Sequence, residues 1–237
     1  MDAEEIIAEA ERKYSTCSTY KDRGCAVFSN EKIEFSTLFM RPEHFYFHFQ
    51  DYGPRRGKEE KFSTIWSENG ETVFRWVRAN SIKLEVVESL YLAIARGVGC
   101  SAGAAGIVLD ELLPTLSENK TSFLRLHDFR LIGSESVGEI DCYVITGIGT
   151  RSRENKIWIA KHDFSVRRFF RDLSSTASEQ NAEMQQLFEN TELMALLREK
   201  GIAPPTAEAT ADHVHHTEYL YTEAAFDEDF EFPGRPV

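Results

Sequence analysis

Aromatic residues alternate with polar ones along several short segments of residues 25–87, and this pattern limits the folds open to the chain. In one of these segments Phe45, Phe47 and Phe49 are separated by a Tyr and a His. Side chains of a β-strand point alternately to its two faces, so the three Phe rings leave the strand on the same side. A sheet with many rings on one face needs an apolar cover. Either the chain's own helices or an apolar ligand supplies it.

The strand-like segments fall into two blocks on either side of a helical stretch. Strands are predicted through residues 25–87, through 124–172 and again at 213–223, and Asn69-Gly70 is a strong hairpin signal. A first helix is predicted to begin with a capping box at Asp2–Glu5, and Ile6, Ile7, Ala10 and Tyr14 form its apolar stripe. Two more helices are predicted at 88–96 and 102–113, separated by Gly97-Val-Gly99. Strands grouped around central helices indicate an α+β fold with an antiparallel sheet.

A late amphipathic segment interrupts the second series of strands. Residues 178–200 are predicted to form a helix that buries Met184, Leu187, Phe188, Met194 and Leu197. A linker with Pro204-Pro205 follows it. We therefore expect one domain, residues 1–237, with an inserted helix and linker at about 174–212.

Composition excludes several classes of protein. Hydrophobic content of 42% and charged content of 28% are those of a soluble globular protein. The net charge of −12 argues against binding to nucleic acid or to an anionic lipid surface, because both favour basic faces. The first residues show no signal peptide, and the glycines and Arg96 in Leu90–Leu109 favour small-residue helices over a membrane span. The four cysteines, at 17, 25, 100 and 142, lack metal-site spacing; free thiols are expected, with a Cys17–Cys25 disulfide as the alternative.

Three motifs invite a chemical interpretation, and each lacks the context that the chemistry needs. Gly99-Cys-Ser-Ala-Gly103 matches the G-x-S-x-G pattern of serine hydrolases, but a helix rather than a strand is predicted before it. Residues 97–102 also fit a dinucleotide fingerprint and lack the same strand. Asp212–His216 contains three histidines without a further metal ligand nearby. We therefore expect no catalytic residue, no metal site and no cofactor, with a hydrolase using Ser101 as the alternative.

The aromatic strands remain as the candidate site. The residues chosen for an apolar ligand-binding wall are Phe45, Phe47, Phe49, Trp66, Phe74 and Trp76. The helices expected to face this wall consist largely of Ala and Gly. Small residues opposite large rings either leave room for a ligand or allow a helix to approach closely, and the sequence leaves both open.

The chain resembles the outer-membrane lipoprotein-sorting protein family, which has the LolA/LolB-like fold. The resemblance rests on motifs in order along the chain: a first helix ending at Tyr14, then residues 18–24, Phe39–Phe49 with its Arg-Pro, Gly97–Gly103, Cys142–Gly147, Lys156–Ala160 and the closing Phe230–Pro233. Three features depart from the family: the absent signal sequence, Ala160 where members often have Asp, and the inserted helix at 178–200.

The resemblance implies a curved, unclosed antiparallel half-barrel with helices over its concave face. Its implied function is non-enzymatic binding of a lipid or a lipidated protein, with the acyl chains held in an apolar cavity. A membrane-protein partner and a monomeric state are also expected, and no nucleic acid. The expected location is the periplasm or cell envelope for a trimmed mature chain, and otherwise the cytoplasm. A structural or sensory interaction module, its half-barrel filled by its own side chains, is the other alternative.

Overall fold

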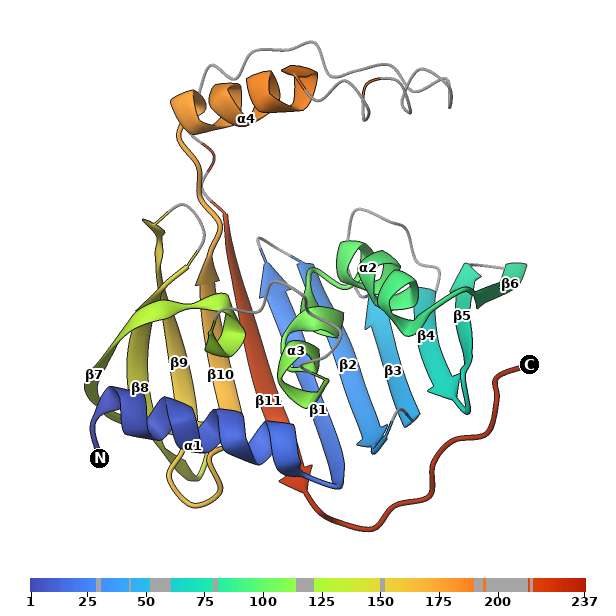
Figure 1. Ribbon diagram of the computed structural model, residues 1–237, viewed down its shortest axis with the longest axis horizontal. Helices are drawn as coiled ribbons and strands as arrows, with labels where there is room; N and C mark the ends of the chain where they lie inside the picture. Colours follow the sequence, from blue (N-terminus) through green and yellow to red (C-terminus); the bar gives the residue numbers. More distant parts are fainter. Residues whose placement is uncertain are drawn as a thin grey trace.

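One antiparallel sheet organises the molecule (Figure 1). The computed structural model describes residues 1–28, 31–42, 44–51, 61–78, 81–113, 122–149, 152–189, 194, 213 and 215–237. Within these residues eleven strands form a single sheet that does not close into a barrel. They are β1 Thr19–Phe28, β2 Glu31–Met40, β3 His44–Asp51, β4 Lys61–Glu68, β5 Glu71–Arg78, β6 Ser81–Val87, β7 His127–Val137, β8 Ile140–Ile148, β9 Glu154–Ala160, β10 Val166–Asp172 and β11 His216–Phe226. The predicted α+β half-barrel is confirmed.

The order of the strands shows how the two blocks join. The sheet runs β6-β5-β4-β3-β2-β1-β11-β10-β9-β8-β7, so the last strand fits between the first strand of one block and the last strand of the other. Every pairing is antiparallel. The two edges, β6 and β7, follow each other in the chain, and the helical segment between them crosses the sheet from one edge to the other (Figure 1).

Helices cover one face of the sheet, called the inner face here. They are α1 Ala3–Thr16, α2 Leu90–Cys100, η2 Ala104–Gly106, α3 Leu109–Leu112 and η4 Phe123–Arg125. In Figure 1, α1 crosses the half of the sheet that holds β7–β11, and α2 lies at the other half, where it contacts β4, β5 and β6. Their buried side chains join those of the inner face in one large core. Among the described helices, none has the length and hydropathy that crossing a bilayer requires.

The first helix is fixed at both ends, and its sequence predicts the contacts at its start. The Asp2 carboxylate accepts from the Glu5 amide at 2.9 Å, and the Glu5 carboxylate accepts from the Asp2 amide at 2.9 Å, which completes the capping box. The predicted stripe of Ile6, Ile7, Ala10 and Tyr14 is buried. At the other end the Arg41 guanidinium donates to the carbonyls of Tyr14 at 3.0 Å and of Cys17 at 2.7 Å. A cation at this position is also stabilised by the negative end of the helix dipole.

The predicted break at Gly97-Val-Gly99 is wrong, because α2 continues through both glycines to Cys100. Glycine costs a helix about 1 kcal/mol relative to alanine. Gly97 is buried, and a Cβ atom there would lie 2.6 Å from Ile65 Cδ1 and 3.3 Å from Ala105 Cβ. Tertiary packing therefore outweighs helix propensity at this position. The chain turns instead at Ala102 and Gly103, whose φ angles are 51° and 88°.

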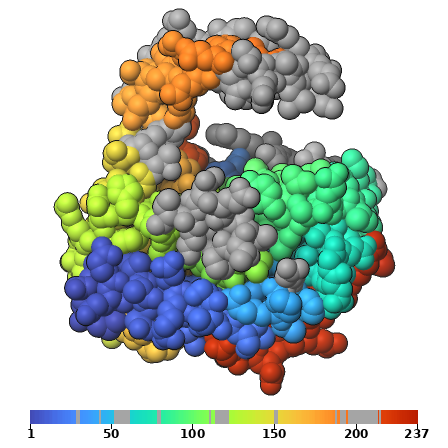
Figure 2. Space-filling model, viewed as in Figure 1, coloured from blue at the N-terminus to red at the C-terminus, as the bar shows by residue number. Residues whose placement is uncertain are grey.

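The inserted helix α4, Ala177–Glu189, extends beyond the ends of β10 and β11, away from the sheet (Figures 1 and 2). A Thr176–Glu179 capping box begins it, with the Thr176 amide donating to Glu179 at 2.6 Å, and Arg153 pairs with Glu179 at 2.7 Å. Phe188 is 41% exposed, so its predicted burial is wrong. The Leu187 side chain, residues 190–193 and 195–200, and the Pro204-Pro205 linker lie outside the described part.

Candidate functional site

Five of the six predicted wall residues lie on the inner face. Phe45, Phe47 and Phe49 on β3 are 1–3% exposed. The register places Phe47 opposite Ile65 of β4 and Ile65 opposite Phe74 of β5, so Phe74 and Trp76 share this face. Ring centroids lie 5.8 Å apart for Phe47–Phe49 and 5.2 Å apart for Phe74–Trp76. Phe35 of β2 extends the row, stacked 6.0 Å from Phe47.

Trp66 lies on the opposite, outer face, so its assignment to the wall is wrong. It pairs with Tyr46 and Val73, which point away from the helices. Its indole N–H donates to the carbonyl of Pro233 at 2.9 Å, and the C-terminal segment covers the ring. The hairpin signal at Asn69-Gly70 contains this information, because a two-residue turn puts Trp66 opposite Val73 and hence on the other face from Phe74.

Small residues of α2 and η2 lie in the same core as the wall, and Gly97 allows close approach to Ile65 of β4. Ala93 and Gly97 of α2 and Ala104 and Ala105 of η2 are buried in the same core as the wall residues. Ile94 is the one large buried side chain on α2. The question left open by the sequence is therefore answered for these residues: the helix lies directly on the sheet.

A small pocket remains beside this cover. It has a volume of about 90 Å³ and is lined by Val98, Gly103, Gly106, Ile107, Leu124, Arg125, Phe169 and Arg171. Sites for drug-sized ligands occupy about 300–1,000 Å³. The pocket is thus too small for a whole acyl chain. Its lining combines an apolar floor with two guanidinium groups, a combination that suits an apolar ligand with an anionic end.

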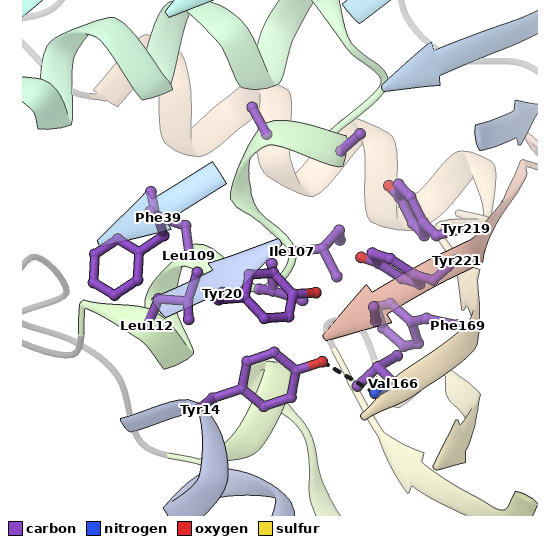
Figure 3. Close-up of a cluster of buried hydrophobic side chains, with 14 of the residues drawn as sticks. Tyr14, Tyr20, Phe39, Ile107, Leu109, Leu112, Val166, Phe169, Tyr219 and Tyr221 are labelled. Atoms are coloured by element: carbon purple, nitrogen blue, oxygen red, sulfur yellow. Dashed lines mark hydrogen bonds between the residues drawn. The ribbon is translucent and has the colours of Figure 1, made fainter. Parts of the chain in front are cut away.

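A buried polar cluster, missed by the sequence analysis, lies deeper on the inner face. Figure 3 shows Tyr14, Tyr20 and Tyr221 close together, with the Tyr14 hydroxyl accepting from the Val166 amide at 3.0 Å. The Tyr20 hydroxyl donates to Asp22 at 2.9 Å. Asp22 is 2% exposed, and burial raises its pKa to about 7. The signal in the sequence is the alternation of Tyr20 and Asp22 with the charged residues Lys21 and Arg23 along β1.

The Tyr221 hydroxyl belongs to the same cluster. It is buried and has no hydrogen-bond partner among the residues that the structure describes. Burial, with the Asp22 charge as a further cause, holds the pKa of Tyr221 well above its usual range. The cluster therefore offers polar groups inside an otherwise apolar core.

The geometry of a serine hydrolase is not assembled around Ser101. Ser101 is fully buried, follows helix α2 rather than a strand, and its hydroxyl accepts from the Ala105 amide at 3.1 Å. The nucleophile elbow needs a strand before its turn, and this position has none. The dinucleotide fingerprint at residues 97–102 lacks the same strand.

The histidines and cysteines form no cluster of ligands in the part of the chain that the structure describes. His213 and His215 stack at 5.6 Å, and His216 lies 3.4 Å from Asp172. The remaining predicted candidate, Asp212, lies outside the described residues. The four cysteines are free thiols, with Cys17 and Cys142 buried. Burial raises the pKa of Cys17 to about 11.

No family model matches the chain, and no curated relative does. Several solved structures are similar over nearly its whole length. The lipoprotein LppX of Mycobacterium tuberculosis shares 8% identity, with 97% of each chain covered and a TM-score of 0.44. A LolA superfamily protein of Nitrosomonas europaea shares 11% identity, with 99% of this chain and 98% of that chain covered and a TM-score of 0.30. A putative outer membrane lipoprotein-sorting protein domain of Vibrio parahaemolyticus shares 10% identity, with 96% and 93% covered and a TM-score of 0.32. The likeness is one of fold.

Proposed function

We propose that the protein is a non-enzymatic binding protein for a lipid or for the acyl chains of a lipidated protein. The observation that carries the proposal is the row of aromatic rings on the inner face, covered by a segment of Ala and Gly. The rings are Phe45, Phe47, Phe49, Phe74 and Trp76. Such a wall binds acyl chains without directional contacts, at roughly 0.8 kcal/mol per buried methylene.

The structure corresponds, in this proposal, to the closed state of the binding site. An entering chain displaces α2 and η2 and takes over the apolar cover of the rings. Ile94 is the one large buried side chain that α2 then withdraws from the core. The outer side of α2 already carries exposed apolar residues, with Tyr91 60% and Leu92 39% exposed. The displaced segment thus has apolar residues on both its inner and its outer side, and these residues contact the apolar ligand in the open state.

The pocket next to η2 is the proposed position of the ligand's polar end. Arg125 and Arg171 line it beside Phe169. Guanidinium groups form strong, geometrically specific bonds with carboxylate and phosphate oxygens. The proposal therefore favours an anionic lipid, such as a fatty acid, over a neutral one.

An interaction module with a filled core is the second candidate. The observation in its favour is the fit of the cover: the wall rings Phe45, Phe47 and Phe49 are almost fully buried, and the pocket holds only about 90 Å³. In this case the outer surfaces carry the function and the core is purely structural.

Binding of an environment-sensitive fatty-acid probe separates the two. We expect binding in the micromolar range or tighter by the parent protein, and weaker binding by Phe47→Ala. Phe62→Ala is the matched control, because it removes the same ring from a half-buried position on the outer face of the neighbouring strand β4. Phe47→Asp should abolish binding, since an unpaired carboxylate would enter an apolar site.

Folding is followed in parallel by thermal unfolding, and the Phe47→Ala result counts only while the transition stays cooperative. Failure of the probe to bind the parent protein contradicts the proposal and favours the filled module. Equal effects of Phe47→Ala and Phe62→Ala contradict the position of the site.

A further inference from the structure

β6 is an edge strand, so one row of its backbone hydrogen-bonding groups faces away from the sheet. No other strand in the described residues pairs with its outer side. β6 pairs with β5 in unbroken register from Ser81 to Val87 and contains no proline. The other edge differs: β7 has two register shifts against β8, and Gly133 and Asp128 there have φ angles of 155° and 54°. Bulges of this kind protect an edge against pairing, and β6 lacks them.

The side chains of β6 are apolar on the solvent-exposed side. Ile82, Leu84 and Val86 point to the outer face and are 63%, 37% and 61% exposed. Lys83 and Glu85 point to the inner face. An edge strand with three exposed aliphatic residues in a row is a typical site for pairing with a further strand.

We propose that β6 binds β6 of a second copy of this chain, antiparallel and about a two-fold axis at Leu84. The pairing places Leu84 opposite the partner's Leu84 and each Ile82 opposite a Val86. On the other face each Lys83 comes opposite the partner's Glu85. Three apolar pairs and two pairs of opposite charge result, all from one seven-residue strand. The two sheets become one continuous sheet across the interface.

Charge selects this register over its neighbours. In two antiparallel strands related by a two-fold axis, residues directly opposite each other point to the same face of the sheet. The register can therefore slip only in steps that preserve this match. One such step puts Lys83 opposite Lys83, and the step in the other direction puts Glu85 opposite Glu85. Like charges directly opposite each other destabilise a strand pair, whereas opposite charges stabilise it. Only the register centred on Leu84 pairs unlike charges.

The present partners of these two charges leave them available. Glu85 accepts from Arg96 at 2.7 Å, in a pair whose side chains are 38% and 45% exposed, and Lys83 lies 4.9 Å from the centre of the Trp76 ring. Exposed ion pairs contribute at most about 1 kcal/mol. A contact between Lys83 and the partner's Glu85 therefore competes with little. A single strand pair also buries less than a standard interface, so we expect a reversible dimer.

Sedimentation across a range of concentrations tests the dimer. The parent chain should shift from monomer to dimer as its concentration rises. Leu84→Lys should keep the chain monomeric, because it places two ammonium groups across the axis. Leu131→Lys is the matched control, because Leu131 lies on the other edge strand, β7, and is 40% exposed. This variant should dimerise like the parent.

Charge exchange then tests the register. Lys83→Glu and Glu85→Lys should each weaken dimerisation at least tenfold, and an equimolar mixture of the two should form a heterodimer with parent-like affinity. A parent chain that stays monomeric throughout overturns the proposal. So does a dimer that Leu84→Lys leaves intact, or a mixture that shows no recovery.

Discussion

The two helices that cover the inner face are attached in opposite ways. Helix α1 buries five residues, among them Ile6, Ile7 and Tyr14, and is capped at its start and clamped by Arg41 at its end. Helix α2 buries Ala93, Ile94 and Gly97, and its N-cap bond from the Leu92 amide to Ser89 is 3.3 Å long. The first helix is thus held by interlocking large side chains, and the second by close approach of small ones.

This difference indicates which half of the molecule can open. Removal of α1 breaks ring contacts of Tyr14 with Tyr20 at 5.3 Å and with Phe226 at 4.9 Å, and uncovers the polar cluster around Asp22. Removal of α2 breaks fewer large contacts, and in the proposed function an acyl chain replaces the lost apolar cover. The proposed function therefore makes the α1 half the frame and the α2 half the movable part, and the predictions below test that division.

The largest expected effect is that of Tyr14→Ala. Tyr14 is fully buried, and loss of a buried aromatic side chain costs about 3–5 kcal/mol of unfolding free energy. Ile94→Ala in α2 should fall at the low end for a buried aliphatic residue, about 2 kcal/mol. Urea unfolding measures both. A loss from Ile94→Ala as large as that from Tyr14→Ala contradicts the division into frame and movable part.

Tyr14→Phe refines the first result. It keeps the ring and removes the acceptor of the Val166 amide, which leaves a buried N–H unpaired at a cost of about 1–3 kcal/mol. A cost near zero shows that water reaches this amide, and hence that the frame is open where we describe it as closed.

The frame should also become less stable as pH rises from about 4 to about 7. The pKa of Asp22 is raised from 3.8 to about 7 by burial, so in this window the folded chain keeps a proton that the unfolded chain releases. The free energy of unfolding therefore falls with increasing pH, by on the order of 4 kcal/mol, and is level above about 7. Urea unfolding at several pH values measures it.

Asp22→Asn isolates this contribution. Burial lowers the pKa of His48 and of His215, and these groups favour the folded state as pH rises, opposite to Asp22. The difference between parent and variant removes the histidine contributions. The variant should lack the decrease between pH 4 and 7; a variant that keeps it shows that Asp22 is not the buried acid responsible.

The inward face of β3 and the β4–β5 hairpin could be predicted from side-chain alternation and turn chemistry. Phe45, Phe47 and Phe49 gave the face of β3, and Asn69-Gly70 gave the hairpin, in which both residues have positive φ. The insertion of β11 between β1 and β10 joins residues about 200 positions apart, and no local pattern encodes such a pairing. The position of Trp66 was encoded by the hairpin register, but its cover is a C-terminal segment whose place depends on the whole fold.

The candidate site was predictable only in part, for a related reason. Side-chain alternation identifies which residues share a face, and it does not say whether a helix fills the space in front of them. Gly97 could mark a helix break or a point of contact, and the answer depends on Ile65, 32 positions away. Asp22 could be a surface residue by its type, and only the packing of Tyr20 around it makes it a buried acid.

A wedge beneath α2 should have an intermediate effect. Gly97→Val forces Ile65 to move, and overpacking of this kind costs about 1–3 kcal/mol. Gly99→Val is the matched control in the same helix, because nothing lies within 4 Å of a Cβ atom there. Hydrogen exchange should become faster in α2 for Gly97→Val alone, with α1 unchanged. Faster exchange in both helices contradicts an independently movable α2.

The smallest expected effects come from the two N-caps. Asp2→Ala removes one half of a reciprocal capping box whose bonds are both 2.9 Å, and Ser89→Ala removes a single, longer bond of 3.3 Å. Loss of an N-cap costs about 0.5–2 kcal/mol, so we expect Asp2→Ala near the middle of that range and Ser89→Ala at its lower end.

The effect of the two substitutions on hydrogen exchange should have the opposite order, with more residues affected in Ser89→Ala. Helix α1 keeps its buried stripe and its Arg41 clamp, so only its first turn should exchange faster in Asp2→Ala. Helix α2 has no clamp of this kind among its described contacts, so Ser89→Ala should speed exchange along most of the helix. Exchange confined to the first turn of α2 shows that its close packing on Ile65 holds it as firmly as the large side chains hold α1.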